Sequence, residues 1–556
     1  MFFALLSHWL KDCDTNHDRC RRGDTSVTTL PTRLIDVGHG SGSAADQAVY
    51  LRATSTMTLD ELEGDVRYIA LSHPWGDRRN NNHFCTTHDN YFARTRDGIC
   101  VDDLPESLGD AVQVTRMLGV RYLWIDTICI IQGPDGDFNT EATRMETVFS
   151  LAYCVITASR ATGTSSGFLS GRDRRDFVDM PFPFPRRSSS SKMKSSRTHS
   201  NDAKDIPTLY ICEAIDDFQN DVIEGALNKR GWVLQERALA RRTIYFTQTQ
   251  TYFECGAGVR SETLARMTNN QAAFLGDPNF PAVAVQSSKG ARIRLYESLY
   301  KTYSALDFTR AYDRPVGIAG LEQRLVRAFN IHGGYGVFDG PFFGRSVLWK
   351  RDETVAGNRE MRPIVFPPRD RRSFYVPTWS WMAYEGVISF MELPFDGVEW
   401  QTGDEEGILS PWAPTTSSNS GHRAGSIDDT DNAVWHTGKS RETAILRARA
   451  RELALPLSEA QEGMVWDVSG GPLAQNTTED EAELEIRCVI IGRQKGGRKV
   501  GNADTFQHYV LVVGKTQPPA AGDLDKGAVY YQRLGVGSIP GRWIVQDRPG
   551  KMILIV

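Results

Sequence analysis

Residues 66–159 alternate between strand-like and helix-like patterns, and this alternation constrains the fold more than any other feature of the chain. Between three apolar strand-like runs, apolar side chains recur at three- and four-residue spacing. The runs are at 67–72, 120–126 and 154–159, and the helical patterns are at 103–119 and 140–152. A β-α-β-α-β order predicts a parallel sheet with right-handed crossovers. We therefore expect an α/β fold here.

Each of these strands ends on polar or charged residues that could bind a ligand. The strand ends are Ser72-His73, Asp126-Thr127 and Ser159-Arg160, and the first continues into Trp75 and Gly76. In parallel sheets, ligands bind beyond the carboxyl ends of the strands. The helix that opens near Glu141 starts from the same edge. The sequence therefore predicts that Ser72, Trp75, Asp126 and Glu141 line one cleft.

The length of 556 residues is too great for one core and predicts two or three domains. An insertion with almost no apolar side chains, at about 185–205, is expected to be disordered, and a second loose segment is expected at about 413–440. We expect a helical lead-in at 1–65, the α/β domain at 66–256, a mainly helical segment at 257–372 and a β-rich C-terminal region at 373–556.

Composition narrows the choice of partners and compartment. The 64 Lys and Arg against 69 Asp and Glu give a net charge of −5, which offers no case for binding nucleic acid. No apolar run approaches the length of a membrane span, and the apolar start of the chain is too short for one. Nine scattered cysteines fit a reducing compartment better than a disulfide framework. We expect a cytoplasmic protein.

Cys13, His17 and Cys20 have the spacing of metal ligands on a helix. A tetrahedral zinc ion needs a fourth ligand, and no partner CxxC or HxxxH motif follows. Free thiols at a packed helix end are therefore the favoured interpretation, and no metal site is predicted.

Four segments resemble a known family. They are "SHPWG", "LWIDTICIIQ", "DFNTEATRM" and "RGWVLQER". In this order they look like the fungal heterokaryon incompatibility (HET) domain, whose pattern has Ser-x-x-Trp-Gly after a strand, Leu-Trp-Ile-Asp before Cys-Ile-x-Gln, and a later Trp-x-Leu-Gln-Glu-Arg. The resemblance covers roughly residues 66–237, so the α/β domain at 66–256 is identified as a HET domain.

This resemblance implies a fold and a chemistry. HET domains are similar in fold to Toll/interleukin-1 receptor (TIR) domains, so a TIR-like parallel sheet with flanking helices is expected. Family members trigger cell death when fungal individuals of unlike genotype fuse. Some TIR domains cleave NAD with a Glu at the start of the helix after a strand, and Glu141 takes that place here. The resemblance thus implies NAD as a substrate and Glu141 as the catalytic residue.

The residues themselves leave alternatives open. Glu141 either handles a proton in an apolar wall or merely complements the helix dipole. Asp126 either binds ribose hydroxyls or caps the next turn, and Trp75 either stacks on a base or plugs the sheet edge. Ser72 is a ligand-contacting hydroxyl rather than a nucleophile. We assign NAD binding to Ser72, Trp75, Gly76 and Asp126.

Trp232 and Glu236 lie on one face of a predicted helix. We expect Trp232 to be a core anchor and Glu236 to form an internal salt bridge rather than to act in catalysis.

Three functions fit this sequence. The first is an effector of heterokaryon incompatibility and programmed cell death whose HET domain binds and hydrolyses NAD. The second is a non-enzymatic signalling module that acts by self-association or by binding a partner. The third is a family member with no role in incompatibility. A cofactor is not firmly implied.

Overall fold

The computed structural model describes most of the chain. Both the insertion expected at 185–205 and the loose segment expected at 413–440 lie outside the described residues. The described residues are 1–20, 30–38, 47–58, 66–77, 84–172, 176–181, 208–267, 277–354, 361–367, 376–402, 407–412, 445–454, 463–468, 485–496, 506–517 and 528–556.

Four parallel strands form the centre of a ten-stranded sheet. Their order across the sheet is β5-β3-β6-β9, and all three pairings between them are parallel. Every residue of these strands is buried, as expected where helices cover both faces of a parallel sheet. The strands are β3 (Tyr68–Ser72), β5 (Tyr122–Trp124), β6 (Cys154–Thr157) and β9 (Arg242–Phe246). The predicted α/β class and the β-α-β-α-β order are confirmed.

Antiparallel strands extend this sheet at both sides. The first side carries β1 (Arg33–Asp36), β2 (Ala48–Ala53) and β4 (Ile99–Cys100). The second carries β10 (Thr251–Cys255), β11 (Gly258–Ser261) and β12 (Arg266–Met267). The expected helical lead-in is therefore corrected, because β1 and β2 belong to the sheet, and the sheet also runs past residue 256. Short strands such as these carry too few residues to show a clear period.

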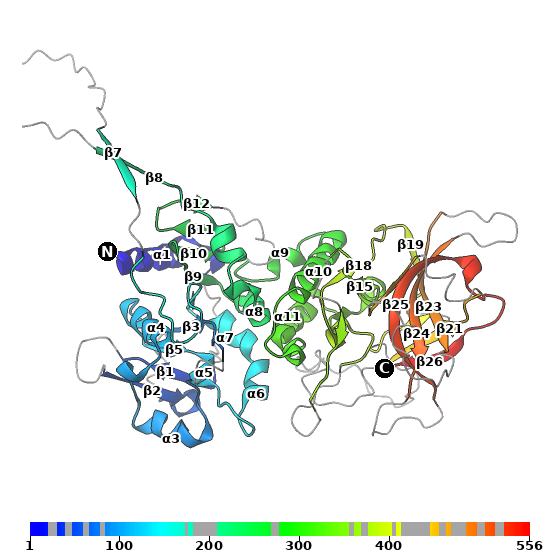
Figure 1. Cartoon of the computed structure of the whole chain (residues 1–556), viewed down its shortest axis with the longest axis horizontal. Helices are drawn as coiled ribbons and strands as arrows, with labels where there is room; N and C mark the ends of the chain where they lie inside the picture. The colour runs from blue at the N-terminus through cyan, green and yellow to red at the C-terminus, as the bar shows by residue number, and fades with distance from the viewer. Residues whose placement is uncertain are drawn as a thin grey trace, which may run out of the picture.

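Helices cover the sheet on its two faces (Figure 1). The predicted helix at 103–119 is confirmed as α4, which buries Leu108, Ala111 and Val112. The predicted helix at 140–152 is instead two helices, α6 and α7, which meet at Arg144. The helices are α1 (Phe2–Asn16), α3 (His88–Arg96), α4 (Glu106–Met117), α5 (Asp126–Cys129), α6 (Phe138–Thr143), α7 (Met145–Leu151) and α8 (Gly231–Leu239).

A hairpin projects from this part of the molecule (Figure 1). It pairs β7 (Phe177–Pro181) with β8 (Thr208–Cys212) in antiparallel register. Its apolar side chains are exposed to solvent, namely Phe177, Val178, Met180, Leu209, Tyr210 and Ile211.

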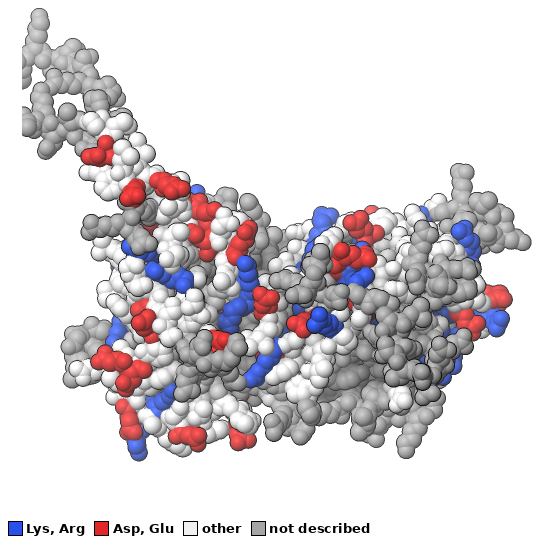
Figure 2. Space-filling model, viewed as in Figure 1, with Lys and Arg blue, Asp and Glu red and all other residues white. Residues whose placement is uncertain are grey.

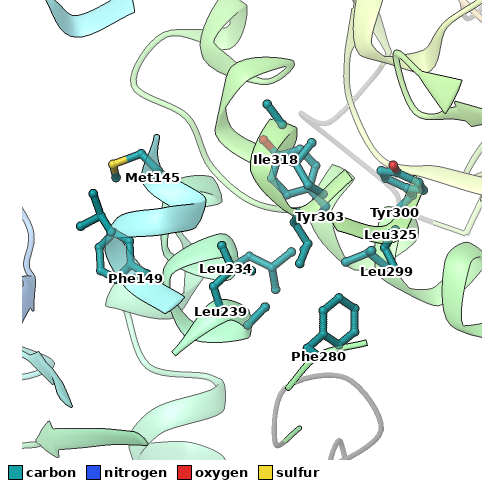
Figure 3. Close-up of a cluster of buried hydrophobic side chains, with 14 of the residues drawn as sticks. Met145, Phe149, Leu234, Leu239, Phe280, Leu299, Tyr300, Tyr303, Ile318 and Leu325 are labelled. Atoms are coloured by element: carbon teal, nitrogen blue, oxygen red, sulfur yellow. The ribbon is translucent and has the colours of Figure 1, made fainter. Parts of the chain in front are cut away.

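The middle of the chain is helical and packs directly against the sheet domain. Its helices are α9 (Ala282–Val285), α10 (Lys289–Ser304), α11 (Ala319–Phe329) and α12 (Phe343–Val347). Figure 3 shows Leu234 and Leu239 of α8 on one side of this seam, with Ile318 and Leu325 on the other. At its polar rim, Glu146 pairs with Arg324 at 2.8 Å and Arg327 at 2.6 Å. One continuous apolar core therefore joins the two parts.

Short strands follow the middle helices and connect them to the C-terminal sheet. They are β13 (Gly333–Gly334), β14 (Val337–Phe338), β15 (Trp349–Arg351), β16 (Arg362–Pro363), β17 (Tyr384–Glu385) and β18 (Ile388–Phe390). The buried Arg533 fixes this connection, because it pairs with Asp467 at 2.8 Å and donates to the carbonyl of Val347 at 2.7 Å.

The C-terminal region is β-rich, as predicted. Its sheet has the order β19-β23-β24-β25-β26-β21-β20 and closes on itself through pairing of β21 with β23. The strands are β19 (Val398–Trp400), β20 (Ile408–Leu409), β21 (Leu446–Arg451), β22 (Met464–Trp466), β23 (Ile486–Gln494), β24 (Gln507–Lys515), β25 (Tyr530–Pro540) and β26 (Lys551–Ile555).

The surface carries charges of both signs. On the face in Figure 2, Lys and Arg are interspersed with Asp and Glu. Within the described residues, no helix is both long enough and apolar enough to cross a membrane.

Candidate functional site

The carboxyl ends of β3, β5 and β6 meet at one edge of the sheet. The chain runs from β3 to β5 on one side and from β6 to β9 on the other, so the connections that follow the neighbouring strands β3 and β6 lead in opposite directions. A crevice forms at such a switch point, and ligands of doubly wound folds bind there. Ser72 of β3 pairs in register with Thr157 of β6 at this position.

Two cavities lie at this edge. The smaller, of about 10 Å³, lies between β3, β6 and α8, and Ser72, Thr157 and Glu236 contribute to its wall. It has room for about one water molecule. The larger is a cleft of about 860 Å³. That volume is within the range of pockets that hold nucleotide-sized ligands.

The cleft is lined by aromatic and charged side chains. Its residues come from the ends of β3 and β5, from α6, α7 and α8, and from the segment after α10. The aromatic residues are Trp75, Trp124, Phe138, Phe149, Trp232, Phe308 and Tyr312, and the charged residues are Asp77, Asp126, Arg230, Glu236, Asp307, Arg310 and Asp313. Flat walls with a few polar groups suit an aromatic ligand that carries charge.

Asp126 organises the floor of the cleft. Its Oδ2 accepts a hydrogen bond of 2.7 Å from the indole nitrogen of Trp75. Its Oδ1 accepts one of 2.7 Å from the backbone N–H of Thr127, at the start of α5, and lies 3.8 Å from Nδ1 of His73. Asp126 therefore bonds the backbone in the first turn of α5, and it also holds the Trp75 ring in place. Gly76 lets the chain turn next to that ring, because its φ is +84°.

Glu236 is the buried acid of the site. It lines both cavities and is 9% exposed. Burial raises the pKa of Glu236 to about 7, and the negative charge of Asp126 also raises it, whereas the nearby Ser72 hydroxyl and Arg230 oppose this rise. A carboxyl group with a pKa close to neutral exchanges protons readily in the physiological range, as a general acid or base must.

The expected internal salt bridge of Glu236 is not formed. No Lys or Arg nitrogen in the described part of the chain lies within ion-pair distance of its carboxylate. The positive charge of Arg230 lowers the pKa of Glu236. The Arg230 guanidinium, however, donates its hydrogen bond to the backbone carbonyl of His73 at 2.8 Å. Trp232 and Glu236 of α8 line the cleft, and Glu236 also meets Ser72 at the small cavity.

Trp232 is a cleft residue rather than a core anchor. It is half-buried, lines the cleft, and packs edge-to-face on Phe138 with 5.9 Å between ring centroids. The spacing of Trp232 and Glu236 on one helical face was predicted correctly. The prediction was wrong about Trp232, because this side chain lines the cleft instead of anchoring the core.

Glu141 lies outside the cleft. It is 4% exposed, accepts a hydrogen bond of 2.7 Å from Thr32, and lies 3.8 Å from Arg144. The residues of α6 that line the cleft are Phe138, Asn139 and Ala142. The sequence argument placed Glu141 one turn before Met145 on a single helix, and therefore next to its apolar face. Glu141 lies instead in α6 and Met145 in α7, so the two residues do not share a helical face.

The four residues predicted to share one cleft are therefore divided. Trp75 and Asp126 line the large cleft together, as does Gly76. Ser72 lines the small cavity next to it, with a buried hydroxyl that makes no well-aligned hydrogen bond. Glu141 lines neither.

One wall of the cleft comes from outside the segment that carries the recognised motifs. The backbone N–H of Gly231 donates to the carbonyl of Asp307 at 2.9 Å, and that of Asp307 donates to the carbonyl of Lys229 at 2.7 Å. A Cβ atom at Gly231 would meet the Phe308 ring at 1.8 Å. The glycine of "RGWVLQER" therefore makes room for this wall. The sequence analysis did not predict that residues 307–313 form this wall.

Comparison with known proteins identifies this domain. Residues 68–236 match the family model described as heterokaryon incompatibility protein (HET). This part of the chain is a HET domain. The match begins at the first residue of β3 and ends at Glu236, so it includes β3, β5, α6, α7 and the part of α8 that lines the cleft, but not the wall at 307–313. No curated protein and no solved structure matched the chain.

Proposed function

We propose that the HET domain binds NAD in the large cleft and hydrolyses the bond between nicotinamide and ribose, as the effector reaction of heterokaryon incompatibility and cell death. The observation that supports this most directly is an aromatic-walled cleft with a buried carboxyl group whose pKa is about 7. The resemblance to TIR domains supplies the reaction class.

The walls of the cleft suit the parts of a dinucleotide. Trp75 and Trp232 offer flat faces for a nicotinamide or adenine ring. Arg230 and Arg310 offer positive charge for a pyrophosphate. Asp126 lies at the carboxyl end of β5, where acidic groups of nucleotide-binding folds meet ribose hydroxyls.

Glu236 is the carboxyl group that we assign to the reaction. As the nicotinamide leaves with the bonding electron pair, positive charge builds on the ribose, and a carboxylate beside it stabilises that charge. Water then adds to the ribose, and its proton passes to Glu236 and on to solvent, which gives ADP-ribose, nicotinamide and a proton. The assignment of Glu141 by resemblance stays a prediction, so the two carboxylates need to be tested together.

The test uses the full chain at high protein concentration, with nicotinamide release followed by chromatography. Glu236→Gln is expected to lower turnover by about 10²–10³-fold, as removal of an electrostatic stabiliser does, while NAD binding by calorimetry persists. Glu141→Gln is the matched control and is expected to retain turnover. The reverse pattern would transfer the catalytic role to Glu141. NAD binding without turnover in the unmodified chain would refute hydrolysis.

A second candidate function is association without catalysis, and the projecting β7–β8 hairpin favours it. Its exposed apolar side chains suit pairing with a second copy of the chain, and among the described residues β7 and β8 pair only with each other. Val178→Lys with Ile211→Lys tests it, with molar mass measured by light scattering and killing measured in cells. Killing that needs the hairpin but survives Glu236→Gln would favour this function over NAD hydrolysis.

A further inference from the structure

Four potential metal ligands converge where helix α1 meets the edge of the sheet. Cys13 lies in the last turn of α1, His17 follows the helix end, and Cys20 closes the short 3-10 helix Asp18–Cys20. Cys255 comes from the end of β10, far along the chain. The ligand atoms of all four residues lie within 4.8 Å of one another.

The geometry of this cluster fits a tetrahedral ion. Zinc binds Cys sulfur at about 2.3 Å and His nitrogen at about 2.0–2.1 Å, so ligand atoms at the corners of the tetrahedron lie roughly 3.5–3.8 Å apart. Nδ1 of His17 is 3.4 Å from Sγ of Cys255. Three thiols with one imidazole form one of the common ligand sets of structural zinc sites.

The surroundings of the cluster also suit an ion held by thiolates. Cys13, Cys20 and Cys255 are buried, and the backbone N–H of Ala257 points at Sγ of Cys255 across 3.5 Å. A Cβ atom at Gly256 would meet Sγ of Cys20 at 3.2 Å and the Pro278 ring at 2.7 Å. Glycine thus leaves the space that the cluster occupies, and backbone N–H groups offset the charge of thiolates.

We propose that Cys13, His17, Cys20 and Cys255 bind a structural zinc ion. The sequence showed three of these ligands, and the fourth was missed because β10 brings it back from a distant part of the chain. The ion would tie α1 to the sheet beside the stacked rings of Trp9 and Phe253, whose centroids are 6.0 Å apart. None of its ligands lines the cleft, so the site stands independently of the proposed NAD chemistry.

The test measures metal content in the full chain, purified under reducing conditions, by mass spectrometry. About one zinc ion per chain is expected. Cys255→Ser is expected to lose the zinc, whereas Cys488→Ser, a buried cysteine of the C-terminal sheet, is expected to keep it. His17→Cys is expected to keep it as well, because four thiolates also form a zinc site.

A measurement on the unmodified protein covers the case in which Cys255→Ser does not fold. A mercurial reagent is added to the native chain, and zinc release is followed with a coloured indicator; release in proportion to the thiols modified supports the site. A chain without zinc, a chain with iron in its place, or a disulfide among the three cysteines would each overturn the proposal. So would a folded Cys255→Ser variant that retains the metal.

Discussion

At the scale of single residues, Glu236 couples the stability of the fold to pH. Burial raises its pKa to about 7 from the ordinary value of 4.5. Between these values the folded protein holds the proton more tightly than the unfolded protein does, so the free energy of unfolding falls as pH rises from about 4.5 to about 7. We expect ionisation of this one group to lower the free energy of unfolding by on the order of 3 kcal/mol over that pH range.

Glu236→Gln isolates this effect because glutamine does not ionise. All other groups titrate equally in the two proteins, so the variant is expected to gain stability over the unmodified chain at pH 8 and to match it more closely at pH 5. Urea unfolding at both pH values measures the difference. A stability gap that does not change with pH would show that Glu236 has no raised pKa.

Single residues also show how far sequence predicts the site. Trp75, Gly76 and Asp126 were found because strand ends gather at one edge whatever the details of packing. Trp232 and Glu236 were placed on the right helix and the same face, but their surroundings were predicted wrongly. Periodicity shows which side chains share a face and carries no information on whether protein or a cavity lies opposite.

At the scale of elements, the contact between α11 and α7 is closer than ordinary side chains allow. A Cβ atom at Gly320 of α11 would meet the Cβ of Glu146 at 2.7 Å, and Oε1 of Gln235 at 3.2 Å. Gly320→Ala is therefore expected to push the helices apart and to destabilise the protein by about 1–3 kcal/mol.

The same substitution elsewhere is a matched control. Gly109 lies inside α4, and nothing lies within 4 Å of a Cβ atom placed there. Gly109→Ala is expected to stabilise by about 0.5–1 kcal/mol, because alanine favours the helix. Chemical unfolding of both variants checks the pair. Equal effects from the two substitutions would contradict the close contact at Gly320.

The elements differ in how well sequence predicts them. The central strands and α4 were predicted because long apolar runs and helical spacing are strong local signals. The break between α6 and α7 was not predicted, since no Pro or Gly marks it and Arg144 is an ordinary helix residue. The flanking strands β1 and β2 were missed because their pairing depends on distant partners.

At the scale of the whole molecule, the HET domain is not expected to be stable by itself. Removing everything after residue 267 keeps all strands of its sheet but uncovers Leu234 and Leu239 of α8, which lie toward the middle helices (Figure 3). It also removes the wall of the cleft at 307–313. Such an apolar surface promotes aggregation.

We therefore expect the fragment 1–267 to aggregate, or to melt well below the full chain. Size-exclusion chromatography and thermal unfolding, with the full chain as control, measure this. A monomeric fragment with an unchanged melting temperature would show that the seam contributes little. The domain boundaries predicted from sequence stay predictions, but the shared core means that function is best tested in the full chain.

The wall formed by residues 307–313 makes the cleft a joint property of two parts of the chain. A ligand that binds only when this wall is docked favours docking through its own binding energy, by about 2.7 kcal/mol at a concentration of 100 times its Kd. Thermodynamic reciprocity then requires that a partner which detaches the middle helices lowers the affinity of the cleft for its ligand by the same factor. The backbone of Asp307 is hydrogen-bonded to Lys229 and Gly231. A displacement of the middle helices therefore changes how much ligand the cleft binds.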